Sequence, residues 1–215
     1  TPNAQASFAI NKGWQDEADT GAATAVQGGF SAERRFVERP VAIVGMAGVM
    51  PQSDDMDEFW FNLQSEKDMI SVIPQDRWNW RDYDGDPFKE ENKTNSKWGG
   101  FMNEVDKFDA MFFGISPREA EMMDPQQRIF LQTVWQAVED SGQKVSDLSG
   151  TKTGLFVGVA TNDYIDLMNS QRIGLDAYTS TGNSHSVLVN RISFLLNLRG
   201  PSAPLDTACS SSLIA

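Results

Sequence analysis

The order of apolar and amphipathic segments is the feature that most limits what this chain can fold into. Continuous apolar runs at 41–45 and 153–160 predict strands that are buried on both faces of a sheet. The segments 54–65, 116–142 and 184–196 have the apolar spacing or the boundary residues of helices. Because strands alternate with helices, we predict an α/β fold.

Two of the expected helices have clear boundary signals. The segment 54–65 begins with acidic residues, which favour a helix N-terminus. Its apolar side chains fall on one helical face: Met56, Phe59, Trp60 and Leu63. The longer segment begins at Ser116 with a proline in its first turn and ends at Gly142. We expect Pro125 to divide it into two helices.

The 215 residues are enough for one domain with a tail. Residues 1–38 are rich in small and polar side chains and lack hydrophobic periodicity, which predicts a flexible leader or interdomain linker. The folded part is expected to cover 39–215. Within it, 71–114 is rich in aromatic residues, so we predict a packed excursion and not a loose loop.

Composition excludes several classes of partner. The net charge of −12, from 30 acidic and 18 basic residues, argues against nucleic acid and anionic membranes as partners. No apolar run approaches the ~20 residues of a membrane helix. The N-terminal residues lack the order of a signal peptide, and a single cysteine cannot form an internal disulfide. These observations favour a cytoplasmic location.

Two short motifs are superficial matches. Gly45 opens a run like a dinucleotide-binding loop, but Ala47 and Met50 stand where that loop needs glycine. The acidic turn 82–86 resembles a calcium loop, but Lys93 occupies the closing acidic position. We therefore predict a solvated acidic turn, no metal site and no cofactor bound by the chain itself.

The only cysteine, Cys209, lies in the run DTACSSSLIA at 206–215. Small neighbours leave room for a reacting group, and the expected strand-to-helix turn supplies free N–H groups and the positive end of a helix dipole. The alternative is an ordinary core cysteine. These ten residues alone leave both interpretations open.

The only histidine, His185, lies in an expected helix without Cys, Asp or Glu at metal-ligand spacing. We expect a packing or surface role for it. A thiol nucleophile normally needs a nearby base. If His185 is not that base, the chain contains the nucleophile of a reaction without its acid–base partners.

Several segments together resemble the ketosynthase (β-ketoacyl-ACP synthase) domain of modular polyketide synthases, over about 39–215. They are VAIVGM at 41–46, WNWRDY at 78–83, KWGGF at 97–101, VDKF at 105–108, FFGISPREAEMMDPQQ at 112–127, WQAVEDSG at 135–142, TGLFVGV at 153–159, NRISFLLNLRGPS at 190–202 and DTACSSSL at 206–213. The pattern WNWRDY, GDP and TNSKWGGF within 78–101 looks most like synthases served by a separate, trans-acting acyltransferase.

The resemblance implies the N-terminal half of a thiolase-like fold, layered α-β-α-β-α, in a domain that forms homodimers. It implies that Cys209 takes the acyl chain as a thioester from the phosphopantetheine of an acyl carrier protein. The family then decarboxylates a malonyl-type extender and joins the two by Claisen condensation. Two histidines from the other half of the family's domain assist this step, and His185 matches neither of their motifs.

We therefore expect a ketosynthase half that carries the nucleophile and is inactive without a complementing C-terminal half. One alternative is a non-catalytic piece that serves as a dimerisation or docking element within a synthase. A weaker one is an acyl-thioester transferase that uses Cys209 alone.

Overall fold

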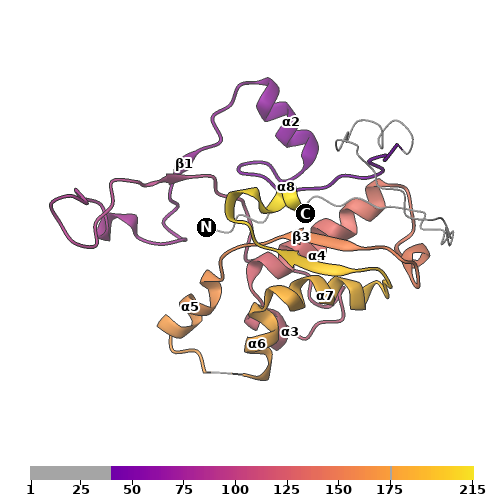
Figure 1. Ribbon diagram of the computed structural model, residues 1–215. Coiled ribbons are helices and arrows are strands. Elements are labelled where there is room, and N and C mark those ends of the chain that lie inside the picture. Colours follow the sequence, from indigo (N-terminus) through magenta and orange to yellow (C-terminus); the bar gives the residue numbers. More distant parts are fainter. Residues whose placement is uncertain (1–39, 175) are drawn as a thin grey trace, which may run out of the picture.

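A parallel pair of strands lies at the centre of the computed structural model, which describes residues 40–174 and 176–215 (Figure 1). Strand β3 (Leu155–Gly158) pairs with β4 (Ser202–Leu205), so that the two strands run side by side along their whole length. The predicted leader over 1–38 lies outside the described residues. The α/β class is confirmed, because helices pack against this sheet.

One face of β3 forms the hydrophobic core together with two helices. Leu155, Val157 and Val159 alternate along the strand and are each at most 5% exposed. Helices α4 (Pro125–Asp140) and α7 (His185–Leu195) cover them. The helix side chains in this core include Phe130, Leu131, Val134, Val138, Leu188, Val189 and Ile192. Burial of these side chains is the main source of stability for the sheet.

The other face of β3 is covered only at its end, by the short helix α8 (Ser211–Ile214). A Cβ atom added to Gly158 would lie 2.7 Å from the backbone carbon of Ser211, so only glycine allows this approach. Phe156 points to the same face and is 46% exposed. The prediction that 153–160 is buried on both faces is therefore wrong within the described residues, because they leave Phe156 about half exposed.

The predicted break at Pro125 is confirmed. Helix α3 (Pro117–Met122) begins at Ser116, whose hydroxyl accepts the Glu119 backbone N–H at 3.2 Å. The carboxylate of Asp124 accepts the N–H of Gln126 at 2.8 Å and so caps α4. Proline lacks the N–H that a helix interior needs but fits a first turn, so each proline begins a helix.

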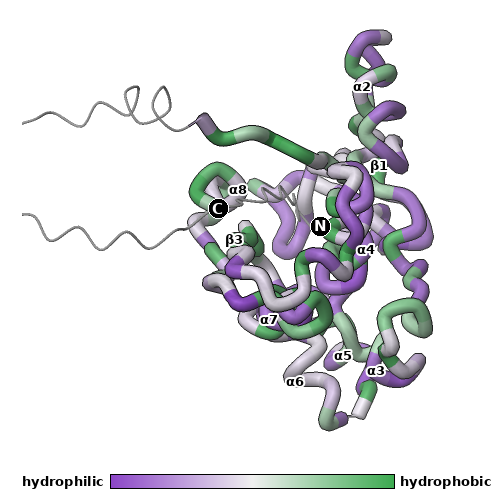
Figure 2. The backbone as a smooth tube through the Cα atoms, turned by 90° about the vertical axis from the view of Figure 1, so that its right-hand side faces the viewer, coloured by the Kyte–Doolittle hydropathy of each residue, from purple (hydrophilic) through white to green (hydrophobic). Residues whose placement is uncertain are grey.

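The expected helices at 54–65 and 184–196 are present as α2 (Met56–Gln64) and α7. The helices and strands not yet described are β1 (Ser71–Val72), β2 (Trp98–Gly99), α5 (Asp163–Ser170) and α6 (Ala177–Asn183), with 3-10 turns at Trp80–Asp82, Val145–Leu148 and Ala208–Ser210. Strands β1 and β2 pair antiparallel. Both α2 and the β1–β2 region stand away from the central sheet (Figures 1 and 2).

The predicted strand at 41–45 is wrong. This segment is extended but pairs with no strand among the described residues, and Ile43 is 74% exposed. It lies against the end of α4, where the N–H of Met46 donates to the carboxylate of Asp140 at 2.8 Å. An apolar run becomes a buried strand only beside partner strands that satisfy its backbone groups, and the described residues provide none here.

Helix α2 forms as predicted, but the described residues cover its apolar face only in part. Trp60 is 61% exposed and Leu63 is 45% exposed. The buried side chain is instead Asn62, which donates to the carbonyl of Gln52 at 3.0 Å and to the hydroxyl of Ser53 at 2.9 Å. Periodicity predicts a helix and its apolar face, but it does not say what covers that face.

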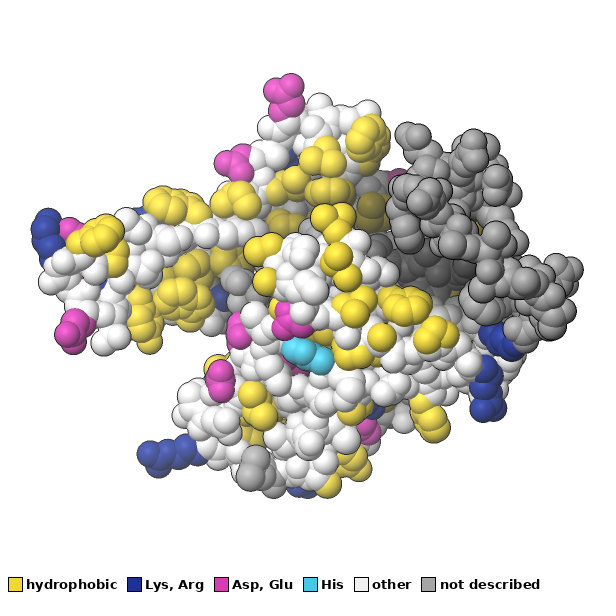
Figure 3. Space-filling view, viewed as in Figure 1, with side chains coloured by type: hydrophobic (Ala, Val, Ile, Leu, Met, Phe, Trp, Pro, Cys, Tyr) yellow, Lys and Arg dark blue, Asp and Glu magenta, His cyan; other side chains and the backbone are white. Residues whose placement is uncertain are grey.

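The aromatic excursion at 71–114 packs over part of its length. Phe108 and Phe113 stack with ring centroids 5.4 Å apart, and Phe112 meets Trp135 of α4 edge to face at 4.8 Å. Trp78 also meets Tyr83 edge to face at 5.2 Å. Other apolar side chains of this region lie on the surface (Figure 3), and Phe88 is 94% exposed. The prediction of a packed excursion is therefore confirmed in part.

The acidic turn at 82–86 is solvated, as predicted. Its carboxylates pair with lysines: Asp86 with Lys89 at 2.9 Å and Asp84 with Lys97 at 3.8 Å.

Nowhere in the part of the chain that the structure describes is a helix both long enough and apolar enough to span a membrane.

We predict that the Asp124 cap makes stability depend on pH. Burial is the main cause that raises the pKa of this carboxyl, and the N–H of Gln126 offsets part of it. When the pKa of a carboxyl is higher in the folded state than in the unfolded state, the free energy of unfolding falls as pH rises between these two pKa values. Asp124→Asn keeps the cap without the charge. Its stability relative to the wild type should therefore increase from about pH 3 to about pH 7.

Urea denaturation at several pH values measures this difference. Asp124→Ala serves as the control, because it should cost about 1 kcal/mol relative to Asp124→Asn at every pH through loss of the cap. A difference between wild type and Asp124→Asn that stays constant with pH would contradict the prediction.

Candidate active site

Cys209 lies in the turn that joins β4 to α8, as the sequence predicts. The chain leaves β4 at Leu205, forms the 3-10 turn Ala208–Ser210 and continues into α8. The Cys209 side chain is exposed. The interpretation as an ordinary core cysteine is therefore wrong for the described residues.

Hydrogen bonds fix the turn around Cys209. The hydroxyl of Ser211, which is buried, accepts the N–H of Thr207 at 2.9 Å and donates to the carbonyl of Ala208 at 2.7 Å. The carboxylate of Asp206 accepts the N–H of Ala208 at 3.0 Å. These short side chains act locally on the backbone, as Ser, Thr and Asp do at turns. The thiol is thus presented on a fixed turn.

The residue before the thiol has a strained backbone. Ala208 has φ +53°, in the left-handed region that residues other than glycine rarely adopt. Such strain persists only where the surroundings hold it, and it gathers at functional sites. A strained turn between a strand and a helix is also how hydrolases of the α/β class expose a nucleophilic side chain.

The neighbouring strand ends in a similar strained turn. After β3, Thr161 has φ +51°. Its carbonyl accepts hydrogen bonds from the Gln126 side-chain amide at 3.3 Å and from Nε2 of His185 at 3.0 Å. Because a carbonyl can only accept, Nε2 of His185 has to bear the hydrogen. His185 therefore holds backbone, in agreement with the packing role expected for it.

A cavity of about 270 Å³ opens beside this turn. It is lined by Arg77, Trp78, Gly100, Phe101, Met102, Val105, Asp124, Pro125, Gln126, Thr161, Asp163, Tyr164 and Leu167. Most of these side chains are apolar or aromatic. Gln126 is 4% exposed, and its Oε1 atom is buried without a hydrogen-bond partner among the described residues. The cavity lining is therefore mostly apolar, as in small-molecule sites.

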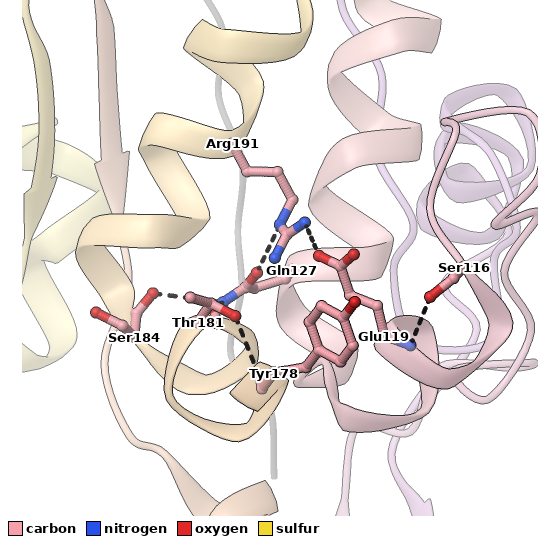
Figure 4. Close-up of polar contacts among 7 residues, drawn as sticks. All are labelled: Ser116, Glu119, Gln127, Tyr178, Thr181, Ser184 and Arg191. Atoms are coloured by element: carbon pink, nitrogen blue, oxygen red, sulfur yellow. Dashed lines mark hydrogen bonds and ion pairs between the residues drawn. The ribbon is translucent and has the colours of Figure 1, made fainter. Parts of the chain in front are cut away.

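A network of hydrogen bonds and one ion pair connects the helices α3, α4, α6 and α7 (Figure 4). The guanidinium of Arg191 on α7 pairs with Glu119 of α3 at 2.5 Å and donates to Oε1 of Gln127 at 3.2 Å. The amide of Gln127 donates in turn to the carbonyls of Thr181 at 3.1 Å and Ser184 at 3.3 Å. Helices α3, α4, α6 and α7 are tied together in this way, which fixes where α7 begins.

Comparison with known proteins identifies the family. The sequence matches the family described as beta-ketoacyl synthase, N-terminal domain, over residues 38–215. It is 48% identical over 200 residues to polyketide synthase PksN of Bacillus subtilis, an alignment that covers 86% of this chain and 4% of that protein. It is 45% identical over 175 residues to polyketide synthase ThaG of Burkholderia thailandensis, covering 81% of this chain and 3% of that protein.

Solved structures agree. The oxazolomycin ketosynthase domain OzmH KS7 of Streptomyces albus superimposes with a TM-score of 0.72 at 41% identity, covering 80% of this chain and 30% of that one. The ketosynthase from module 6 of the bacillaene synthase of Bacillus subtilis gives 0.70 at 40% identity, covering 80% and 28%. The chain therefore belongs to the β-ketoacyl synthase family, in the branch of polyketide synthase ketosynthases, and its fold is thiolase-like. It spans less than a third of the length of these relatives.

Sequence reasoning missed three residues at or near the two strained turns: Ala208, Thr161 and Gln126. The strain at Ala208 and Thr161 has no sequence signal, since neither residue is a glycine. Thr161 follows a strand, and the rule that sites form at the carboxyl ends of parallel strands would have pointed to it. Nothing in the pattern of α4 distinguishes Gln126 from the other polar residues of that helix.

We predict that Gly158→Ala displaces the Cys209 turn. The added methyl would lie within 2.7 Å of the backbone of Ser211 and Ser212, and overpacking of this kind costs about 1–3 kcal/mol. The variant should melt at a lower temperature and alkylate with iodoacetamide at a different rate. Gly174→Ala is the matched control, because a Cβ there meets nothing within 4 Å. Identical melting and alkylation in the two variants would contradict the close contact between β3 and α8.

Proposed function

We propose that Cys209 is the acyl-carrying nucleophile of a ketosynthase that elongates a polyketide chain. The observation that supports it best is an exposed thiol on a strained strand-to-helix turn, in a chain of the ketosynthase family. An exposed thiol is accessible to a thioester, and the fixed turn holds it ready.

In the first step the Cys209 thiolate attacks the carbonyl of an acyl thioester carried on the phosphopantetheine of an acyl carrier protein. The bond from that carbonyl to the carrier sulfur breaks, and the carrier leaves as its thiolate. The acyl chain is then a thioester of Cys209. Backbone N–H groups at the start of a helix can stabilise the oxyanion of the tetrahedral intermediate.

In the second step a malonyl-type extender on a carrier protein loses carbon dioxide, and the electron pair of the broken bond forms an enolate. The enolate carbon attacks the acyl carbonyl on Cys209, and the thiolate leaves. The product is a β-ketoacyl chain two carbons longer, held on the carrier. The ketosynthase resemblance gives this step two histidines, and the single histidine of this sequence, His185, holds the Thr161 carbonyl instead.

We also propose that this span acts only together with the rest of a ketosynthase. Large apolar side chains are exposed on α7, on α8 and at 41–46, among them Phe194 at 88% and Leu213 at 88%. Exposed apolar surface of this extent marks an interaction site. A complementing part of the domain would cover it and bring the histidines. The same exposed surface also favours the second candidate, a non-catalytic docking element.

We also propose the trans-acting acyltransferase type, on the basis of the pattern WNWRDY, GDP and TNSKWGGF within 78–101. WNWRDY contains the 3-10 turn Trp80–Asp82, and TNSKWGGF contains β2, which pairs with β1.

We predict that Cys209→Ala abolishes acyl uptake by the intact ketosynthase that carries this span. Without the sulfur no thioester can form, whatever else binds. Intact-mass measurement after incubation with an acyl thioester detects the added acyl group. Cys209→Ser is the matched control for shape and should lose most of the uptake, because an alcohol is far less ionised than a thiol at neutral pH. Undiminished uptake by Cys209→Ala would refute the assignment.

The span by itself should form no β-ketoacyl product. Adding the remainder of the ketosynthase as a separate polypeptide should restore condensation, which product analysis by mass spectrometry measures. A restored activity would also separate the enzyme from the docking element, which would gain no activity under any condition. Product formation by the span alone would show that the additional histidines are not needed.

A further inference from the structure

The turn after β3 contains Thr161, whose backbone conformation is one that threonine rarely adopts. Thr161 is β-branched and has φ +51°, a combination that is a genuine outlier. Residues in such regions keep their conformation only where their surroundings over-determine it. Neighbouring groups must therefore hold Thr161 in place.

Two side chains from different helices hold it. The amide of Gln126, from the first turn of α4, and Nε2 of His185, from the first residue of α7, both donate to the Thr161 carbonyl. Next to this turn, Asn162 donates to the carbonyl of Asn183 at 2.8 Å. Three hydrogen bonds from separate elements thus converge on two residues, which is far more than a surface turn needs.

The turn lies at the same sheet edge as the Cys209 turn. Gly158, the last residue of β3, pairs with Leu205, the last residue of β4, and neighbouring strands lie about 4.8 Å apart. Thr161 comes soon after one strand end, and Cys209 comes soon after the other. Thr161 also lines the cavity. Thr161 therefore follows a strand that ends at the sheet edge carrying the thiol, and it also lines the apolar cavity.

We propose that Gln126 and His185 are positioning residues, which hold Thr161 as a wall of the acyl site and so set which acyl chains Cys209 accepts. This inference rests on the proposed function. Neither residue touches the reacting atoms. They act through the Thr161 carbonyl, and a looser turn would let Cys209 discriminate less between chains of different length.

The test compares rates of Cys209 acylation in the intact ketosynthase. Acetyl, butyryl and octanoyl thioesters of N-acetylcysteamine serve as probes, and intact mass measures the initial rates. His185→Leu and Gln126→Leu should each narrow the spread of rates across the three probes by about fivefold, the effect of losing one hydrogen bond. His185→Gln should restore the wild-type spread, because its amide N–H can donate to the same carbonyl.

Two further variants separate positioning from general damage. Asn190→Leu places a leucine at an exposed position of the same helix and should keep the wild-type spread. Thr161→Gly removes the strain, because glycine adopts this conformation freely. In that background His185→Leu should have no further effect, a coupling that a double-mutant cycle measures. If a leucine variant does not melt cooperatively, the test uses two other variants. They are Thr161→Gly alone and Thr161→Gly combined with His185→Gln, and the spread of acylation rates across the three probes is compared between them.

The outcomes are distinct. Absence of acyl uptake by the wild type contradicts the proposed function. Uptake with the same spread in wild type, His185→Leu and Gln126→Leu contradicts only the positioning role. Equal spreads in His185→Leu and His185→Gln, or additive effects in the Thr161→Gly background, also overturn it.

Discussion

The parallel pairing of β3 with β4 is the constraint on which the rest of the structure depends. Parallel strands end at the same edge of a sheet, so their pairing brings together two turns that are far apart in sequence. One turn contains Cys209 and the other contains Thr161. The core formed by α4 and α7 fixes the strands from one face. Gly158 lets α8 pack against the other, so the thiol is held close to the sheet.

Local strain and its restraint recur at this sheet edge. Ala208 and Thr161 both adopt left-handed backbone conformations, which glycine adopts readily and other residues rarely do. Hydrogen bonds at each residue hold it in this conformation. At Ala208 these bonds come from Ser211 and Asp206 within the same turn. At Thr161 they come from two helices. A nucleophile on such a scaffold has little reorganisation to undergo when a thioester arrives, which is how preorganised sites lower barriers.

Local signals in the sequence predicted local structure well. Pro125 predicted the break between α3 and α4, and the run around Cys209 predicted the strand-to-helix turn. Predictions that depended on distant partners failed. Apolar character at 41–45 cannot say whether a partner strand is present, and the apolar face of α2 cannot say what packs on it. The hydrogen bonds that hold Thr161 could not be predicted, because they are tertiary contacts of Gln126 and His185.

The thiol on the β4 turn is proposed to receive the acyl chain, beside the held turn that follows β3. The most direct measurement is a crystal structure of the intact ketosynthase containing this span, after reaction with an octanoyl thioester. We expect continuous density from Sγ of Cys209 into an acyl chain that contacts Thr161, with both strained turns retained. An acyl group on any other side chain, or a chain on Cys209 that leads away from Thr161, would contradict this expectation.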